Sequence, residues 1–129
     1  MTLACGVDLI EIDRVAAVIV RWGERFLTRI FTPAEVAYCR GRVPELAVRF
    51  AAKEATSKAL GTGIVGISWR EMEVVSDRRG KPTMVLHGRA AARAAEIGLR
   101  QFEVSLSHSR AMAIAMVVAS GPETTNPDC

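Results

Sequence analysis

The spacing of apolar and polar positions changes along the chain and predicts helices mainly in its first half. Residues 3–10 form a short apolar run that is typical of a buried strand. A helix is predicted over residues 13–22, with Asp13 as its N-cap and a glycine after its last residue. A Thr-Pro-Ala-Glu segment begins a second helix over residues 32–41, and a proline begins a third over residues 44–60.

The second half of the chain predicts mostly strands. Residues 68–75 and 83–87 alternate apolar and polar positions on either side of a turn, so they predict a hairpin. An alanine-rich helix is predicted over residues 89–97, followed by strands over residues 102–108 and 112–119. Hairpins outnumber helical crossovers in this order, which favours an α+β fold with a largely antiparallel sheet. The last strand is apolar at both alternating sets of positions, so we expect both of its faces to be covered.

Length and composition indicate one globular domain. The chain has 129 residues, of which 50% are hydrophobic and 24% charged, as in an ordinary folded domain. We place that domain at residues 1–120 and expect residues 121–129, which are polar and hold two prolines, to form a disordered tail. The longest uncharged runs are far shorter than the roughly 20 residues that cross a bilayer, so no membrane association is predicted.

The N-terminal residues, the cysteines and the charge bear on compartment and partners. The chain lacks the basic start of a secretory signal, and its three cysteines show no paired spacing. We therefore expect a reduced, cytoplasmic location with neither a disulfide framework nor a zinc site. The net charge of +3 suggests an anionic partner. Its 17 Lys and Arg residues are spread along the chain and only 5% of residues are aromatic, so no nucleic-acid partner is predicted.

Asp8 interrupts the first apolar run, at a position where a strand favours an apolar residue. Burying an unpaired carboxylate is costly, so this side chain must be paired, bound to a metal or placed at a strand end. A strand-end residue that caps a neighbouring turn is an equally good interpretation, and the residue alone leaves both open.

Three residues of the third helix, Phe50, Glu54 and Lys58, lie four positions apart and therefore share one face. Spacing alone favours an exposed ion pair between Glu54 and Lys58. The face also continues from the apolar Phe50, and Arg49 and Lys53 lie on the adjoining strip. One carboxylate among several cations on a half-buried strip also suits a metal-chelated polyphosphate, in which the carboxylate holds the metal and the cations neutralise phosphate.

Two further segments carry groups suited to phosphate. The Gly61-Thr62-Gly63 sequence after the third helix would let a ligand approach the backbone closely. His108 ends a predicted strand, where a lone histidine is most often structural or exposed to solvent. Two serines and an arginine beside His108 also suit a phosphate group.

The first helix presents a cationic face. Arg14, Arg21 and Arg25 are spaced seven and four residues apart, so one continuous helix would align them beside Val18 and Trp22. This face is either a solvated surface or a docking site for an acidic helix of a partner, with arginines steering and apolar residues supplying contact. A glycine between Trp22 and Arg25 weakens the alignment of Arg25.

Four segments match the motifs of one family, in order and at the family's spacing. They are residues 6–14 (GVDLIEIDR), 49–63 (RFAAKEATSKALGTG), 80–82 (GKP) and 105–109 (SLSHS). They resemble the holo-acyl-carrier-protein synthases, the small bacterial 4′-phosphopantetheinyl transferases, over about residues 3–120. The resemblance implies that family's α+β fold and a homotrimer with active sites between subunits. It also implies transfer of the phosphopantetheine arm of coenzyme A to a serine of an apo acyl carrier protein, with adenosine 3′,5′-bisphosphate leaving.

The resemblance also implies roles for individual residues. Asp8 and Glu54 would bind Mg²⁺, which bridges to the pyrophosphate of coenzyme A, and Lys58 would stabilise or protonate the leaving phosphate. The residues expected to bind coenzyme A are Arg49, Lys58, Gly61, Thr62, Pro82 and His108. Arg14 would engage an acidic helix of the carrier protein. Together with the rest of the face on the first helix described above, the residues expected to bind the carrier protein are Arg14, Val18, Arg21, Trp22 and Arg25.

Two questions stay open at this point. The group that activates the substrate serine can be any one of three: a metal-polarised water, Glu54 or Asp8. A non-catalytic module that binds coenzyme A or a carrier protein is the alternative function. It predicts binding without release of the bisphosphate.

Overall fold

The computed structural model describes residues 1–122, which form an α+β fold. Its larger sheet has three antiparallel strands, in the order β1 (Thr2–Glu11), β5 (Met112–Gly121) and β4 (Gln101–His108). A separate antiparallel hairpin is formed by β2 (Met72–Ser76) and β3 (Pro82–Leu86). The predicted fold class and the predicted hairpin are therefore confirmed.

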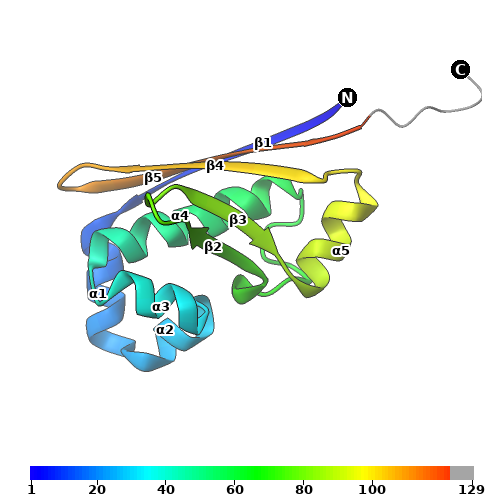
Figure 1. The fold of residues 1–129 in the computed structure, drawn as a ribbon. Helices are drawn as coiled ribbons and strands as arrows, with labels where there is room; N and C mark the ends of the chain where they lie inside the picture. The colour runs from blue at the N-terminus through cyan, green and yellow to red at the C-terminus, as the bar shows by residue number, and fades with distance from the viewer. Residues whose placement is uncertain (123–129) are drawn as a thin grey trace, which may run out of the picture.

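The described residues also form five α-helices and one short 3₁₀ helix. They are α1 (Ile12–Trp22), α2 (Glu24–Ile30), α3 (Pro33–Cys39), α4 (Val43–Ala59), η1 (Trp69–Glu71) and α5 (Gly88–Glu96). α4 runs beneath the three-stranded sheet, while α1, α2 and α3 gather at one end of the molecule and α5 packs at the other (Figure 1). α4 contacts all three strands of the larger sheet, strand β2 of the hairpin, and the helices α1 and α3.

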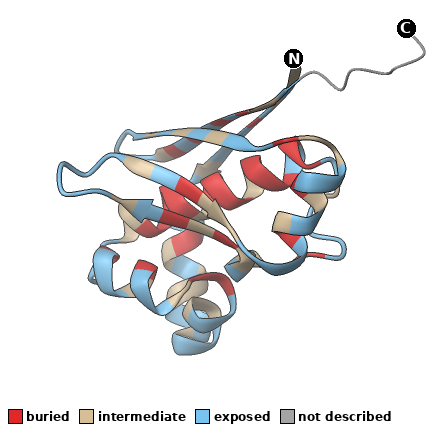
Figure 2. Ribbon diagram, turned by 45° about the vertical axis from the view of Figure 1, so that its right-hand side comes forward, coloured by how far each residue is buried: buried red, intermediate tan, exposed pale blue. Residues whose placement is uncertain are grey.

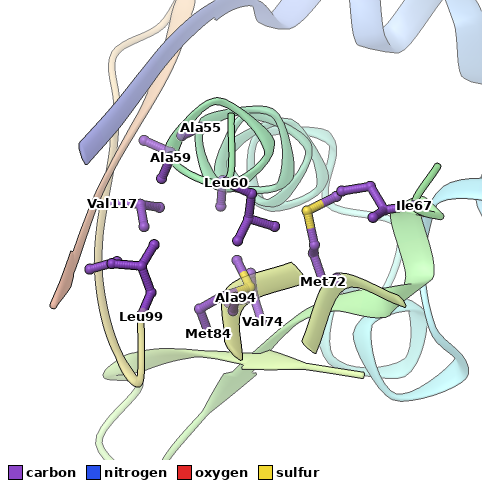
Figure 3. Packing of buried hydrophobic residues seen from close by; sticks show 14 of the residues in the cluster. Ala55, Ala59, Leu60, Ile67, Met72, Val74, Met84, Ala94, Leu99 and Val117 are labelled. Atoms are coloured by element: carbon purple, nitrogen blue, oxygen red, sulfur yellow. The ribbon is translucent and has the colours of Figure 1, made fainter. Parts of the chain in front are cut away.

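α4 is the most deeply buried element of the fold (Figure 2). Ala55 faces β1, and Gly6 of β1 lies so close to the Ala55 carbonyl that a Cβ at Gly6 would collide with it. On the other side of the helix, Leu60 and Met72 fill the space toward the hairpin (Figure 3). The close approach at Gly6 brings Asp8, two residues further along β1, against the same helix.

The face of the sheet that points away from α4 is apolar and exposed. Ile114, Met116 and Val118 of β5 are 39%, 49% and 42% exposed. The register sets Leu9 opposite Ile114 and Val7 opposite Met116, and both β1 residues are more than half exposed. Within one chain only the face of β5 toward α4 is covered, so the expectation that both faces are covered stays a prediction about contact with another copy. We refer to these five residues as the outer sheet face.

Three local predictions differ from the structure. No helix is predicted over α2, because Gly23 breaks the helical pattern with a φ of +53° and nothing after it signals a cap. Asp13 lies in the first turn of α1, which has Glu11 as its N-cap without a side-chain bond. The first residues of the predicted strand over residues 68–75 form η1 instead.

The C-terminal strand extends past its predicted end. β5 includes Gly121, the first residue of the predicted tail, and the tail residues beyond Pro122 lie outside the described residues. Within residues 1–122, none of the helices is long and apolar enough to cross a membrane. The longest of them, α4, has 17 residues and lies inside the fold.

Candidate active site and docking groove

α4 carries the candidate site residues on two different faces. Arg49 and Glu54 are five residues apart, which sets them about 140° apart around the helix axis. Glu54 and Lys58 lie toward β1, whereas Arg49 lies toward the hairpin and β4. We refer to Asp8, Glu54 and Lys58 as the carboxylate side, and to Arg49, Pro82 and His108 as the cationic side.

On the carboxylate side, a lysine joins α4 to β1. Lys58 Nζ donates hydrogen bonds to the carbonyl oxygen of Val7 (2.9 Å) and to Asp8 Oδ1 (3.2 Å). The lysine side chain is 54% exposed and the Asp8 side chain 19% exposed. Lys58 therefore pairs across to Asp8, in place of the pair with Glu54 that the four-residue spacing favours.

Asp8 and Glu54 face one cavity of about 430 Å³. The pKa of Glu54 is raised because the side chain is partly buried and because the negative Asp8 lies near it, while Lys58 opposes the shift. Two carboxylates that repel each other across a cavity are relieved by a divalent cation. Mg²⁺ binds in this way, through one or two carboxylates completed by water and substrate phosphate oxygens. Asp8 and Glu54 are donors of the kind that Mg²⁺ takes, although no cluster of three or more His, Cys, Asp or Glu side chains occurs within residues 1–122.

On the cationic side, Arg49 is held from several directions. Its Nη1 donates to the carbonyl oxygen (3.1 Å) and the carboxylate (2.8 Å) of Glu45, and its Nη2 donates to Ser76 Oγ (3.0 Å). The Tyr38 ring lies over the guanidinium, with its centroid 4.5 Å from Cζ. Arg49 is only 2% exposed, yet its Nε is the one buried side-chain polar atom without a hydrogen-bond partner among the described residues. The guanidinium therefore keeps one N–H donor without an acceptor, and such a donor is costly to leave unpaired.

This arginine lines a cavity of about 510 Å³ between α4, the β2–β3 turn and β4. The other lining residues with side-chain donors are Tyr38, Lys81, Ser105, Ser107 and His108. His108 is exposed, and its Nδ1 lies 3.3 Å from the carbonyl oxygen of Ser109. The structure thus brings together the predicted Arg49, Pro82 and His108. It also adds Tyr38 from α3, which no local sequence signal marks.

One chain keeps the two sides apart. Asp8 on β1 and Leu106 on β4 both lie opposite Ala115 of the central strand. Two strand spacings, about 10 Å, therefore separate the two edges of the sheet. His108 lies two residues beyond Leu106 on the far strand. Within one chain, the predicted site residues form two half-sites rather than one pocket.

The loop after α4 holds two more predicted ligand residues. Gly61 has a φ of +75°, which favours glycine, and Thr62 Oγ1 donates to the carbonyl oxygen of Gly63 (2.8 Å). The loop begins where α4 ends, shortly after Lys58. Of the described residues that line the two cavities above, none belongs to this loop, so the ligand role of Gly61 and Thr62 stays a prediction.

The predicted phosphate role of Lys53 is wrong, because its side chain is fully buried. Nζ donates to Glu35 Oε1 (2.7 Å) and to the carbonyl oxygens of Met72 (2.5 Å) and Trp69 (3.2 Å). These acceptors use all three ammonium donors, so none is left for a ligand. Glu35 also forms the predicted capping box of α3 with Thr32, which is confirmed.

A groove beside the carboxylate side collects several predicted docking residues. It has a volume of about 470 Å³ and is lined by Val18, Trp22, Arg25, Phe26, Arg29, Ile30, Phe50 and Trp69. Trp69 stacks on Phe50 with ring centroids 5.2 Å apart, which gives the groove an aromatic wall. Among the lining residues, Arg29 lies on α2, Phe50 on α4 and Trp69 on η1. Helical spacing within α1 gives no signal for them.

The three predicted docking arginines do not form one stripe. Gly23 separates α1 from α2, so Arg25 belongs to the second helix. Arg14 lines the carboxylate-side cavity and Arg25 lines the groove, while the Arg21 guanidinium lies 5.1 Å from the Trp22 ring centroid. The helix is not continuous, so Arg25 falls outside the alignment as the glycine suggested, whereas Arg14 and Arg21 both lie on α1. The two cavities nevertheless adjoin, because they share lining residues on α1, α2 and α4.

The α+β fold, the paired carboxylates beside a lysine and the cations suited to phosphate together define the class of this protein. The chain belongs to the 4′-phosphopantetheinyl transferase superfamily, whose sequence profile matches residues 4–116. The family expected from the motifs is therefore confirmed.

Its relatives narrow the class further. The holo-acyl-carrier-protein synthase of Herpetosiphon aurantiacus is 52% identical over 126 aligned residues, with 92% of this chain and 99% of that protein covered. The same enzyme of Dehalococcoides mccartyi is 52% identical over 117 residues, with 91% and 98% covered. Among solved structures, the Helicobacter pylori holo-acyl-carrier-protein synthase in complex with coenzyme A matches with a TM-score of 0.83. It is 30% identical, with 90% of this chain and 99% of that chain covered.

Proposed function

We propose that this chain transfers the 4′-phosphopantetheine arm of coenzyme A to a serine of an apo acyl carrier protein. A bond forms between the serine oxygen and the phosphorus of the arm, and the P–O bond of the pyrophosphate breaks. Adenosine 3′,5′-bisphosphate leaves and the serine proton is released. Family membership, the names of the relatives and the coenzyme A bound to the H. pylori protein support this reaction. The observation that carries it is the opposed pair Asp8 and Glu54 next to Lys58.

In this proposal, the carboxylate side neutralises charge at the reacting phosphorus. Asp8 and Glu54 would hold Mg²⁺, which when bound would supply positive charge to the pyrophosphate oxygens. Displacement at phosphorus depends on positioning and charge neutralisation more than on covalent help, so no protein nucleophile is needed. Lys58 is exposed and held by Asp8 at 3.2 Å, so its Nζ can turn to donate to the leaving phosphate.

The cationic side binds the phosphate groups of coenzyme A. Arg49 offers its unpartnered Nε to a phosphate oxygen, and the exposed His108 supplies a second contact. Pro82 lines the same cavity, and the Gly61-Thr62 segment, which follows Lys58 at the end of α4, contacts another part of coenzyme A. The fixed position of Arg49 supports this role, because a guanidinium already held by Glu45 and Tyr38 loses little freedom when a ligand binds.

The two sides work together when they come from different copies of the chain. They lie at opposite edges of the sheet, and the outer sheet face is apolar and exposed. A continuous apolar face of this kind marks a surface that another protein covers. A head-to-tail interface that closes into a ring would set the carboxylate side of one copy against the cationic side of the next. The working unit in this proposal is a homotrimer with three such sites, as the family resemblance implies.

The groove is the proposed docking site for the acyl carrier protein. Its lining includes the aromatic Trp22 and Trp69 and the cationic Arg25 and Arg29, while Arg21 packs on Trp22 and Arg14 lines the adjoining cavity. An apolar groove with arginines around it suits an acidic amphipathic helix. Because the groove adjoins the carboxylate-side cavity, a helix docked there brings neighbouring residues of the carrier protein close to the reacting phosphorus.

The reaction is tested by incubating the chain with coenzyme A, Mg²⁺ and an apo acyl carrier protein, then weighing the carrier protein by mass spectrometry. We expect the carrier protein to gain the mass of the arm and the bisphosphate to appear. Glu54→Ala should abolish transfer with the fold intact, whereas Glu96→Gln, which changes an exposed carboxylate on α5, should transfer normally. Coenzyme A binding without release of the bisphosphate would indicate a binding module and contradict the proposal. Metal-dependent turnover by Glu54→Ala would overturn the assignment of Glu54 as a ligand.

A further inference from the structure

We propose that Arg93 is a positioning residue that holds the loop after α4 in its ligand-binding shape. Arg93 lies on α5, and its Nε donates a hydrogen bond to the carbonyl oxygen of Leu60 (3.0 Å). The guanidinium also reaches the next residue, since a Cβ added at Gly61 would lie 3.6 Å from Nη2. The inference rests on the proposed function, in which Gly61 and Thr62 line the coenzyme A pocket.

The bond falls on the C-terminal end of α4, where Leu60 is the C-cap residue. The last carbonyl groups of a helix lack partners within the helix, and together they form the negative end of the helix dipole. That end repels an anionic ligand unless cations offset it. Lys58 lies in the last turn of α4 and Arg93 binds the Leu60 carbonyl, so two cations lie where a polyphosphate has to approach.

The loop at residues 60–66 depends on this contact for its shape. Gly61, Gly63 and Gly66 have positive φ values of +75°, +56° and +80°, and glycine loses more conformational freedom on ordering than any other residue. The loop's other hydrogen bonds are local and join it to itself or to α4. Among the hydrogen bonds of residues 1–122, the one from Arg93 alone ties the loop to an element distant in sequence. Without it, ligand binding must include the cost of ordering the loop.

α5 gives Arg93 a fixed base and leaves its side chain accessible to change. Ala90 and Ala94, on the inner face of α5, are 0% and 4% exposed, and Ala94 belongs to the same buried cluster as Leu60 (Figure 3). The Arg93 side chain is 31% exposed, and it forms an ion pair with Glu96 at 3.5 Å. Replacing Arg93 therefore leaves the core intact, so an effect on ligand binding can be separated from unfolding.

The first test is calorimetric titration of coenzyme A without carrier protein. Arg93→Met, which keeps the length of the side chain, should weaken coenzyme A binding about tenfold, the effect of losing one charged hydrogen bond. Arg93→Lys keeps the charge at the helix end and should lose less. Glu96→Gln removes the ion pair but not the bond to Leu60, so it should bind as the wild type does. The KM for the carrier protein should stay unchanged in all three variants, whereas a merely structural role would raise it too.

The second test is hydrogen exchange of the free protein, which needs no ligand. Amides of residues 60–66 should exchange faster in Arg93→Met than in Glu96→Gln, while the amides of β5 should not change. Unchanged coenzyme A affinity in Arg93→Met, or unchanged exchange in the loop, would overturn the positioning role. If the wild type binds no coenzyme A while loop exchange still responds to Arg93, the proposed coenzyme A pocket fails and the structural tie between Arg93 and the loop stands.

Discussion

Two lysines five residues apart on α4 have opposite environments. Lys53 is fully buried, and its ammonium group donates to Glu35 and to two backbone carbonyls. Lys58 is 54% exposed and pairs with Asp8, a carboxylate that itself faces a cavity. Their spacing sets the two lysines about 140° apart around the helix axis, but that angle alone does not tell which of them is buried.

The buried pair Lys53–Glu35 and the exposed pair Lys58–Asp8 should therefore have different roles, the first in the stability of the fold and the second in ligand binding. A buried ion that loses its partner has neither water nor an opposite charge, so a buried pair resists change. An exposed pair contributes little to stability, and its lysine can exchange Asp8 for a ligand oxygen. We therefore expect Lys53 to govern stability and Lys58 to govern transfer.

The largest expected effect is on stability at Lys53. Lys53→Met leaves Glu35 charged and buried without its partner, which should lower the free energy of unfolding by about 3–5 kcal/mol. Urea denaturation measures this loss. Adding Glu35→Gln removes the second charge but keeps an amide oxygen for the backbone of α3, so the double variant should regain part of the stability. A Lys53→Met protein as stable as the wild type would contradict the claim that the buried pair stabilises the fold.

The same substitution at Lys58 should do the reverse. Lys58→Met should lower the rate of transfer about 100-fold or more, because a charge that stabilises the leaving phosphate is removed. Its free energy of unfolding should change by less than about 1 kcal/mol, as for other exposed pairs. Transfer rates and urea denaturation curves of Lys53→Met and Lys58→Met measure the two effects. Normal transfer by Lys58→Met would contradict the assigned role.

Arg14, a cation that lines the carboxylate-side cavity, should affect one substrate only. Arg14→Ala should raise the KM for the acyl carrier protein about tenfold, the loss of one steering contact at an interface. The dissociation constant for coenzyme A should stay nearly unchanged. Steady-state kinetics with each substrate varied in turn measures both, and an equal loss for the two substrates would argue against docking.

The smallest expected effect is a pH-dependent contribution to stability from Glu73, a carboxylate near Lys53. The pKa of Glu73 lies below its ordinary value of 4.5, first because Thr32 donates a hydrogen bond to it and also because His87 and Lys53 lie near. A depressed pKa adds stability that is present above the ordinary pKa and is lost as the pH falls through the folded-state value. Glu73→Gln should therefore melt below the wild type at pH 7, and the gap should narrow below about pH 4.5. A difference in melting temperature that does not change with pH would contradict this contribution of Glu73.

Local signals in the sequence were enough for much of the fold. The turn over residues 77–82 defines the hairpin, and the capping box of Thr32 and Glu35 defines the start of α3. Both are contacts between residues close in sequence. The four-residue spacing likewise placed Glu54 and Lys58 on one face of α4, because helix geometry fixes the angle between them.

The features that the sequence did not predict depend on packing between residues far apart in the chain. Lys53 is buried because Glu35, 18 residues earlier, and the carbonyl of Met72, 19 residues later, enclose it. Helical spacing gives the angle between Arg49 and Glu54 but not which edge of the sheet each one meets. The division into two half-sites therefore follows only from the strand order. α2 was missed for a similar reason, because its short segment is stabilised by packing rather than by caps.

Mixing two inactive variants tests most directly whether each site is built from two copies of the chain. Glu54→Ala lacks a working carboxylate side, and the double variant Arg49→Met with His108→Ala lacks a working cationic side. In mixed oligomers formed from equal amounts, about a quarter of the head-to-tail interfaces should pair two intact sides. We predict that the mixture transfers the arm to the carrier protein although neither variant does so alone. A mixture that stays inactive, with mixed oligomers present by native mass spectrometry, would contradict a site shared between copies.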